Sequence, residues 1–158
     1  MKFSVKFKAD GVRKMFKDLE KEFKEGADGA KAGYYEGEQH KGENATLSEI
    51  ALFNEFGTKD IPARPFLRNA EAKIQQRAPE IVQKGLDDGK TLNKIMAEIA
   101  QDMRNQIIES ITSNTPPPNK PSTIRQKGST HTLIDTGGLR DGVHVAMVKD
   151  GREKPLGK

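Results

Sequence analysis

The stretch EFGTKDIPARPFL, residues 55–67, is the most informative part of the chain for its fold. Gly57 stands where a left-handed residue ends a preceding helix. Pro62 and Pro65 each disfavour helix in the residue before them, and Pro65 suits the first turn of a new helix. The segment therefore predicts a helix stop, a rigid corner around Arg64 and the start of a second helix.

Helices are predicted on both sides of this corner. Upstream, Thr46 and Glu49 form a capping-box pattern, which indicates a helix over 47–56. Downstream, apolar residues recur at helical spacing, and Pro79 predicts a kink or break in that helix.

Two further helices are predicted from amphipathic patterns. Residues 11–25 carry apolar side chains at helical spacing between Lys, Asp and Glu. The cap residue Thr91 precedes a helix over 92–112 that has one continuous apolar face. Packing of this face within the chain is the simpler interpretation, and a coiled-coil partner is the alternative. The face is made by Leu92, Ile95, Met96, Ile99, Met103, Ile107 and Ile111.

Strands are predicted over 2–9, 30–36 and 142–148 from short alternating or β-favouring runs. The predicted fold class is therefore α+β. A small mixed or antiparallel sheet packs against two or three amphipathic helices, with those at 11–25 and 92–112 covering it. At 158 residues the chain is expected to be a single domain.

Two polar segments complete the domain. Residues 113–132 are rich in Pro, Ser, Thr, Asn and Lys, a connection of unusual length for a compact domain. We expect this loop to be mobile in the free protein, with one helical turn over 122–127. Residues 149–158 are expected to form a charged tail.

A second motif, IDTGGLR, spans residues 134–140. Asp135 or Thr136 is expected to cap a short helix that holds Leu139. The triplet Asp-Thr-Gly also occurs in aspartic proteases, but that chemistry needs two carboxylates that share a proton. The chain has no second such triplet, so capping is the better interpretation.

The sequence offers no catalytic constellation, and no enzyme activity or cofactor is expected. There is no cysteine, no phosphate-binding glycine loop and no Gly-x-Ser-x-Gly. The three histidines, His40, His131 and His144, are predicted in loops or at a strand edge without the spacing of a metal site.

The charge pattern leaves a nucleic-acid-binding module as an alternative function. The net charge is +4 and the pI is about 9.2, but acidic and basic residues are interspersed. The strongest local excess is Lys120, Arg125 and Lys127. No run of about 18 apolar residues suggests a membrane span, and we expect neither a membrane nor a specific nucleic-acid partner.

The pairing of EFG with IPARPFL before a long helix, followed by IDTGGLR near the C-terminus, resembles the tail-completion or neck (head–tail joining) proteins of long-tailed bacteriophages and prophages. The resemblance implies a structural virion protein of the neck or tail, assembled in the host cytoplasm. It implies a ring, sixfold like the tail, that contacts other neck, connector and tail-tube or terminator proteins. A tail-terminator or head-closure ring is the nearest alternative. The signature or interface residues that it implies are Phe56, Gly57, Arg64, Pro65, Phe66, Asp135, Thr136, Gly137, Leu139 and Arg140.

Arg64 and Phe66 leave alternatives open. The guanidinium of Arg64 suits a carboxylate or a cluster of backbone carbonyls. It is expected either to bridge within the fold, to Glu55 or Asp135, or to contact a neighbouring subunit. Leu67 is expected in the core, whereas Phe66 fits either the core or an interface.

Overall fold

The computed structural model describes residues 9–39 and 44–157 of the chain. Helices make up most of this part, together with one three-stranded sheet. The helices are α1 (Ala9–Glu25), α2 (Leu47–Phe56), α3 (Phe66–Asp87), α4 (Leu92–Thr112), α5 (Pro121–Lys127) and α6 (Gly138–Asp141), and the strands are β1 (Gly29–Gly33), β2 (His144–Lys149) and β3 (Arg152–Gly157).

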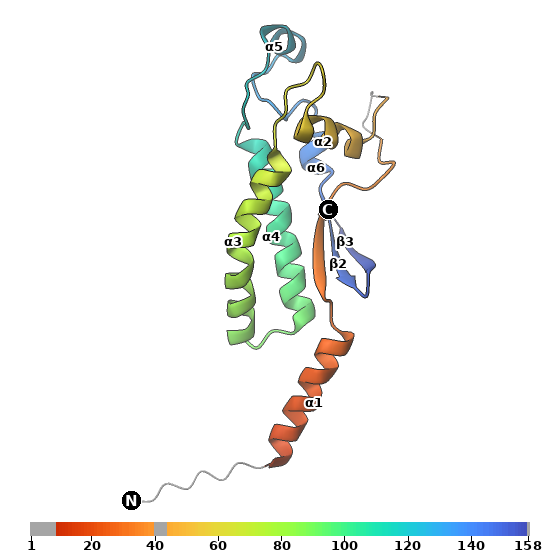
Figure 1. Cartoon of the computed structure of the whole chain (residues 1–158), viewed down its shortest axis with the longest axis vertical. Coiled ribbons are helices and arrows are strands. Elements are labelled where there is room, and N and C mark those ends of the chain that lie inside the picture. The colour runs from red at the N-terminus through yellow and green to blue at the C-terminus, as the bar shows by residue number, and fades with distance from the viewer. Residues whose placement is uncertain (1–8, 40–43, 158) are drawn as a thin grey trace, which may run out of the picture.

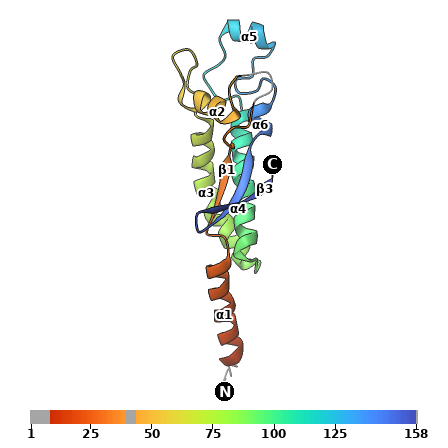
Figure 2. The same cartoon turned by 90° about the vertical axis from the view of Figure 1, so that its right-hand side faces the viewer.

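The molecule is elongated, and α3 and α4 form a long pair of helices along its axis (Figures 1 and 2). The sheet is antiparallel, with strand order β1-β2-β3. α4 packs against α3 and also against β1 and β2. This arrangement confirms the α+β class, and it shows that the apolar face of α4 packs within its own chain.

β3 occupies the residues for which a charged tail is predicted, and it is a strand of the sheet. Asp150 and Gly151 have positive φ values of 48° and 73°, which suits the two-residue turn of a hairpin. Lys149 pairs with Arg152 across this turn. Every residue of β3 is exposed, so no apolar alternation marks the strand. The strand predicted over 2–9 lies outside the described residues except for Ala9, which begins α1.

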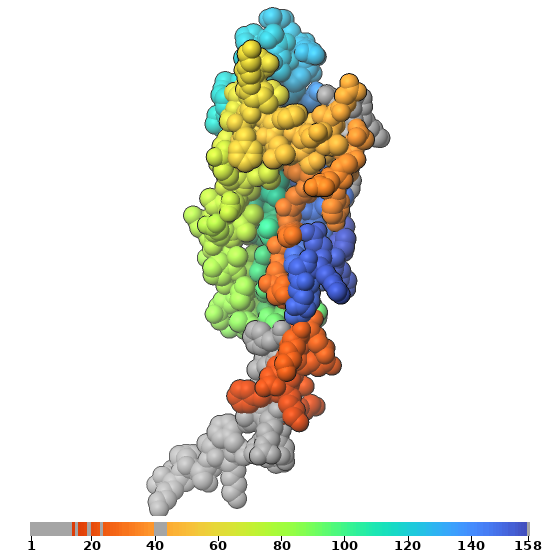
Figure 3. All heavy atoms as spheres, turned by 45° about the vertical axis from the view of Figure 1, so that its right-hand side comes forward, coloured from red at the N-terminus to blue at the C-terminus, as the bar shows by residue number. Residues whose placement is uncertain are grey.

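α1 does not cover the sheet, contrary to the prediction for residues 11–25. It projects from one end of the body (Figures 1 and 3). Its last turn meets the start of α4, where the Leu92 backbone N–H donates to the Glu22 carboxylate over 3.4 Å. Just after α1, the Ala27 N–H donates to the side-chain oxygen of Asn93 over 2.8 Å. The start of α4 therefore holds the root of α1 and directs the helix away from the sheet.

The helix after the corner continues through Pro79, so the predicted break is wrong. Proline cannot donate to the carbonyl four residues earlier. Pro79 lies on the exposed side of α3, where water can hydrate that carbonyl. Contacts with α4 hold the helix before and after this position: Arg77 pairs with Asp102 over 2.9 Å, and Gly85 lies directly against the side chain of Ile95.

The capping box at the start of α2 is confirmed. The Glu49 N–H donates to the Thr46 hydroxyl over 3.3 Å, and the Thr46 N–H donates to the Glu49 carboxylate over 2.8 Å. The hydrogen bonds from Thr46, the backbone one first, lower the pKa of Glu49. α2 ends at Phe56 as predicted. Gly57 has the expected positive φ, 76°, but its ψ of 169° extends the chain, so the prediction of a left-handed helical residue is wrong in ψ.

Gly57→Val is expected to destabilise the protein by on the order of 2 kcal/mol. A β-branched residue fits positive φ poorly. A Cβ at Gly57 would also lie 2.8 Å from the Ala63 nitrogen and 3.0 Å from the Ile61 oxygen. Denaturant unfolding followed by circular dichroism measures the loss.

Gly128→Val is a control for the positive φ alone, because the ψ of Gly128, 14°, differs from that of Gly57. Gly128 also has positive φ, 69°, but a Cβ added there would have no neighbouring atom within 4 Å. Gly128→Val should therefore report backbone strain without crowding. Equal losses for the two variants would show that crowding at Gly57 contributes nothing.

One cluster of buried side chains joins α2, α3, α4 and α6. Phe66 is fully buried within it, which settles its role as a core residue. Leu67, expected in the core, is partly buried at the edge of the cluster. The buried members are Ala51, Phe66, Ala70, Ile107, Ile111, Leu133, Leu139 and Val143.

Residues 113–132 form an anchored lobe that carries α5, which is longer than the single turn expected there (Figure 1). The Asn119 side chain donates to the His131 carbonyl over 2.9 Å, and the Thr132 N–H donates to the Asn114 side chain over 2.9 Å. These bonds tie the two ends of the segment together. Mobility of the lobe in the free protein stays a prediction.

Candidate interaction surface

Hydrogen bonds lock the backbone of the corner between α2 and α3. The Thr58 N–H donates to the Ile61 carbonyl over 2.8 Å. The Thr58 hydroxyl accepts from the N–H groups of Asp60 and Ile61 over 3.3 and 3.1 Å. The Arg64 N–H donates to the Asn54 carbonyl over 2.6 Å, which fastens the corner back onto α2. These bonds confirm the rigid corner that the prolines predict.

Glu55 is a buried carboxylate, 2% exposed, that caps the first turn of α3. Its oxygens accept from the N–H groups of Leu67 and Arg68 over 2.8 and 3.2 Å. Such N–H groups have no partner inside their own helix. The Arg68 guanidinium adds an ion pair over 2.8 Å and lies 5.4 Å from the centre of the Phe56 ring. Pro65 is the N-cap and has no capping side chain, so α2 supplies the cap from outside the helix.

Arg64 is buried, 5% exposed, and its side chain holds the lobe formed by residues 113–132. Its Nε donates to the Pro117 carbonyl over 2.8 Å, and its Nη2 donates to the side-chain oxygen of Asn119 over 3.1 Å. Burial lowers the pKa of the guanidinium. The predicted bridge to Glu55 or Asp135 is wrong, because the Arg64 donors meet a carbonyl and an amide instead. Arg64 is a fold-internal residue with little surface for a neighbouring subunit.

Arg64→Lys is therefore expected to cost about 1–2 kcal/mol of folding free energy. A lysine keeps the charge, but its single ammonium cannot reproduce the two directed bonds of the planar guanidinium. Arg125→Lys is the control, since Arg125 is exposed on α5. Thermal and denaturant unfolding measure both variants. Unchanged stability of Arg64→Lys together with weakened self-association would assign Arg64 to an interface instead.

The second motif is bound to the body through Leu139. Its side chain is buried in the core cluster, and its carbonyl accepts from the Tyr34 hydroxyl over 2.8 Å. Burial raises the pKa of Tyr34. Arg140 pairs with the neighbouring Asp141 over 2.7 Å at the surface, and this pairing raises the pKa of Arg140. The motif thus joins the end of β1 to α6.

The capping role predicted for Asp135 or Thr136 is confirmed in part. Gly137, with φ of 87°, is the N-cap of α6, which therefore has no side-chain cap. The Thr136 hydroxyl accepts from the Gly138 N–H over 3.4 Å. Asp135 makes no capping hydrogen bond to α6 and is exposed on the wall of a cleft beside α2.

α2 presents three large apolar side chains to solvent. Leu52, Phe53 and Phe56 are 52%, 42% and 66% exposed. We call these three residues the α2 patch. The other side of α2, with Leu47 and Ala51, is buried. A group of exposed aromatic and aliphatic side chains on one helix is typical of a contact surface.

A cleft of about 310 Å³ adjoins the α2 patch. Lys127 and Asp135 give its wall a charge of each sign. The Lys127 ammonium donates to the His131 carbonyl over 2.9 Å. Burial lowers its pKa, and the nearby Asp135 charge opposes that shift. The apolar part of the wall includes Ile50, Phe53, Ile61 and Leu133.

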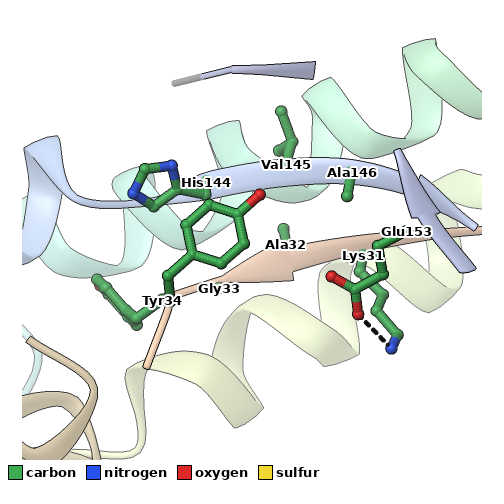
Figure 4. Close-up of a pocket in the computed structure, with 9 residues that line it drawn as sticks. Lys31, Ala32, Gly33, Tyr34, His144, Val145, Ala146 and Glu153 are labelled. Atoms are coloured by element: carbon green, nitrogen blue, oxygen red, sulfur yellow. Dashed lines mark hydrogen bonds and ion pairs between the residues drawn. The ribbon is translucent and has the colours of Figure 1, made fainter. Parts of the chain in front are cut away.

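A smaller hollow of about 140 Å³ lies on the open face of the sheet (Figure 4). His144, at the start of β2, lies 2.6 Å from the Glu38 carboxylate and has its ring 4.3 Å from that of Tyr35. Lys31 pairs with Glu153 across β2 over 2.7 Å. These side chains contact one another and connect neighbouring strands, so their arrangement is explained by a role in stabilising the sheet.

The remaining candidate groups do not gather into a reactive site. Within residues 9–39 and 44–157, no cluster of side chains could hold a metal ion, and no helix is long and apolar enough to cross a membrane. His40 lies outside this range, and the His131 ring lies 3.1 Å from the Thr112 carbonyl. Of the basic residues singled out in the sequence, Lys120 and Arg125 are exposed, whereas Lys127 is engaged with the chain.

Sequence reasoning missed Leu52 and Phe53 as candidate site residues. The signal was available, since α2 is apolar on nearly all sides, a pattern typical of a helix with more than one packed face. It also missed the capping role of Glu55, because the N–H groups from which the Glu55 carboxylate accepts belong to another helix.

Comparison with protein-family models, curated proteins and solved structures finds no match to this chain.

Proposed function

We propose that this protein is a structural component of the neck of a long-tailed bacteriophage or prophage, a tail-completion protein that joins the tail to the head connector. One observation carries the proposal: Phe66 of the first motif and Leu139 of the second belong to the same buried cluster. A family signature that specifies the fold is expected to contribute to the core, as these two motifs do. Their meeting supports a shared structural signature.

The character of the surface supports a binding role. The α2 patch exposes three apolar side chains beside a cleft with apolar walls. Such a surface suits protein–protein contact. In this proposal the protein contacts copies of itself in a ring, sixfold like the tail, together with connector and tail-tube or terminator proteins. It assembles in the host cytoplasm, remains in the virion neck and uses no cofactor.

Deletion of the coding sequence from the phage or prophage that carries it tests the proposal. We expect DNA-filled heads and separate tails in electron micrographs, with infectious particles restored by the wild-type chain supplied in trans. Tails of abnormal length on the deletion would favour a tail-terminator ring. A normal yield of infectious particles without the protein would reject a neck function.

Duplex binding separates this proposal from a nucleic-acid-binding module. We expect weak, non-specific binding at most, because the charges of both signs are interspersed. A true nucleic-acid-binding module would bind duplex at low salt, with an affinity that falls steeply as salt rises. Fluorescence anisotropy with a labelled duplex measures it. Submicromolar binding at physiological salt, lost when Lys120, Arg125 and Lys127 are neutralised together, would put the nucleic-acid function first.

A further inference from the structure

Two exposed apolar surfaces lie on α1 and on α2. Figures 1 and 2 show these helices toward opposite ends of the described molecule. One is the α2 patch with its adjoining cleft. The other is α1, an amphipathic helix of 17 residues that projects from the body (Figure 3). Its Phe16 side chain is 58% exposed. A short helix with a strong apolar stripe gains most of its stability when the stripe packs against another surface. Each of these surfaces therefore calls for a partner.

The α1 helix of one copy cannot reach the α2 patch of the same copy while the contacts at the C-terminal end of α1 hold. The Ala27 N–H donates to the Asn93 side chain over 2.8 Å, and the Asp28 N–H donates to the Val148 carbonyl over 2.9 Å. β1 follows directly and runs from the α1 end toward the α2 end (Figure 2). These contacts keep α1 at the far end of the body from the α2 patch.

We propose that α1 of one copy docks on the α2 patch and cleft of a second copy. The contact is head-to-tail, since each copy gives one surface and receives on a different one, and repeated contacts of this kind close into a ring when the rotation allows. This contact would cover both apolar surfaces of every copy. The inference rests on the proposed ring function and names the surfaces that build the ring.

The dimensions of the two helices fit this contact. α1 is about 26 Å long and α2 about 15 Å, from the rise of 1.5 Å per residue. The docked α1 would therefore cover α2 and continue over the cleft. Phe16 would supply an anchor for this contact, as apolar side chains do in other helix-in-groove contacts.

The charges also fit a second copy better than a strongly charged partner. The sequence of α1 contains five basic and five acidic residues. The cleft wall likewise carries a charge of each sign, from Lys127 and Asp135. A helix that carries both signs can pair with both Lys127 and Asp135, whereas a uniformly charged partner can pair with only one of them and is repelled by the other.

Cysteine cross-linking tests the contact directly, because the native chain has no cysteine. Full-length Phe16→Cys protein is mixed with Phe53→Cys protein at high concentration and oxidised mildly. We expect the mixed disulfide dimer in at least about tenfold excess over the dimer formed with Leu86→Cys protein. Leu86 is the control because it is exposed, at 53%, and lies at the end of α3. Equal yields with the two partners would overturn the proposal.

Self-association gives a second, matched readout. Leu52 and Leu86 are the same residue type with nearly equal exposure, 52% and 53%. We expect Leu52→Asp to weaken self-association in sedimentation experiments by at least about tenfold, with little effect from Leu86→Asp. Circular dichroism checks that both variants stay folded. Equal association constants for the two variants would reject the α2 patch as the docking surface.

A double variant and the phage assay separate the remaining outcomes. An internal disulfide in dilute Phe16→Cys/Phe53→Cys monomers would show that α1 folds back on its own copy, which overturns the second-copy contact. Absence of the mixed disulfide alongside failed head–tail joining in the deletion phage would reject this contact and keep the proposed function. The mixed disulfide alongside a normal deletion phage would keep the contact and reject the neck function.

Discussion

Phe66→Ala is expected to lower the free energy of unfolding by about 3–5 kcal/mol, the usual cost of emptying a buried phenylalanine site. Phe66 is fully buried, with Ala51, Ala70 and Leu139 in the same cluster. The locked corner before it and the capped helix after it leave the backbone little freedom to close the cavity. Denaturant unfolding of the purified variant measures the loss.

Phe56→Ala is the matched control for this prediction. Phe56 lies ten positions earlier on the chain and is 66% exposed. Its replacement should change stability little and weaken self-association instead, since Phe56 belongs to the α2 patch. A large loss of stability from Phe56→Ala, or a small loss from Phe66→Ala, would contradict the division between core and surface in this motif.

Local signals explain why several helices are predictable from the sequence. α2 and α4 begin at the residues that follow Thr46 and Thr91, whose hydroxyls accept from the N–H groups three residues on. The corner after Gly57 follows from residues whose preferences act on their nearest neighbours. The α+β class follows from the same local patterns.

Tertiary contacts explain what the local signals miss. β3 has a polar and exposed sequence, and pairing with β2 makes it a strand. α3 continues through Pro79 because α4 packs alongside it. α1 has the pattern of a helix that covers a sheet, yet the contact of Ala27 with Asn93 turns it away. In each case the deciding contact lies outside the element itself: in the preceding strand for β3, in the following helix for α3 and in Asn93 for α1.

The candidate site residues also depend partly on local sequence and partly on tertiary contacts. The structure brings the two motifs together in one core through Phe66 and Leu139. The partner of Arg64 was not predictable. Every residue has a backbone carbonyl, so the sequence does not show that the one of Pro117 lies beside the guanidinium. The exposure of Leu52 and Phe53 depends equally on which side of α2 meets the core.

Glu55→Ala is expected to destabilise the protein by roughly 2–4 kcal/mol, because it removes the cap of α3 and leaves partly buried N–H groups without a partner. The Glu55 carboxylate accepts from the Leu67 and Arg68 N–H groups and pairs with the Arg68 side chain. It also lies at the positive end of the α3 dipole, which favours a negative charge there. Unfolding in denaturant measures the loss.

Two controls test the mechanism of this loss. Glu55→Gln keeps one acceptor oxygen at nearly the same volume, so it should retain part of the stability while losing the charge. Glu49→Ala removes an exposed carboxylate from the same helix and should cost less, because water can replace its bonds. If Glu55→Gln is as unstable as Glu55→Ala, the ionic contacts dominate. If both match Glu49→Ala, the N–H groups at the start of α3 are hydrated, and the cap from α2 does not hold the corner.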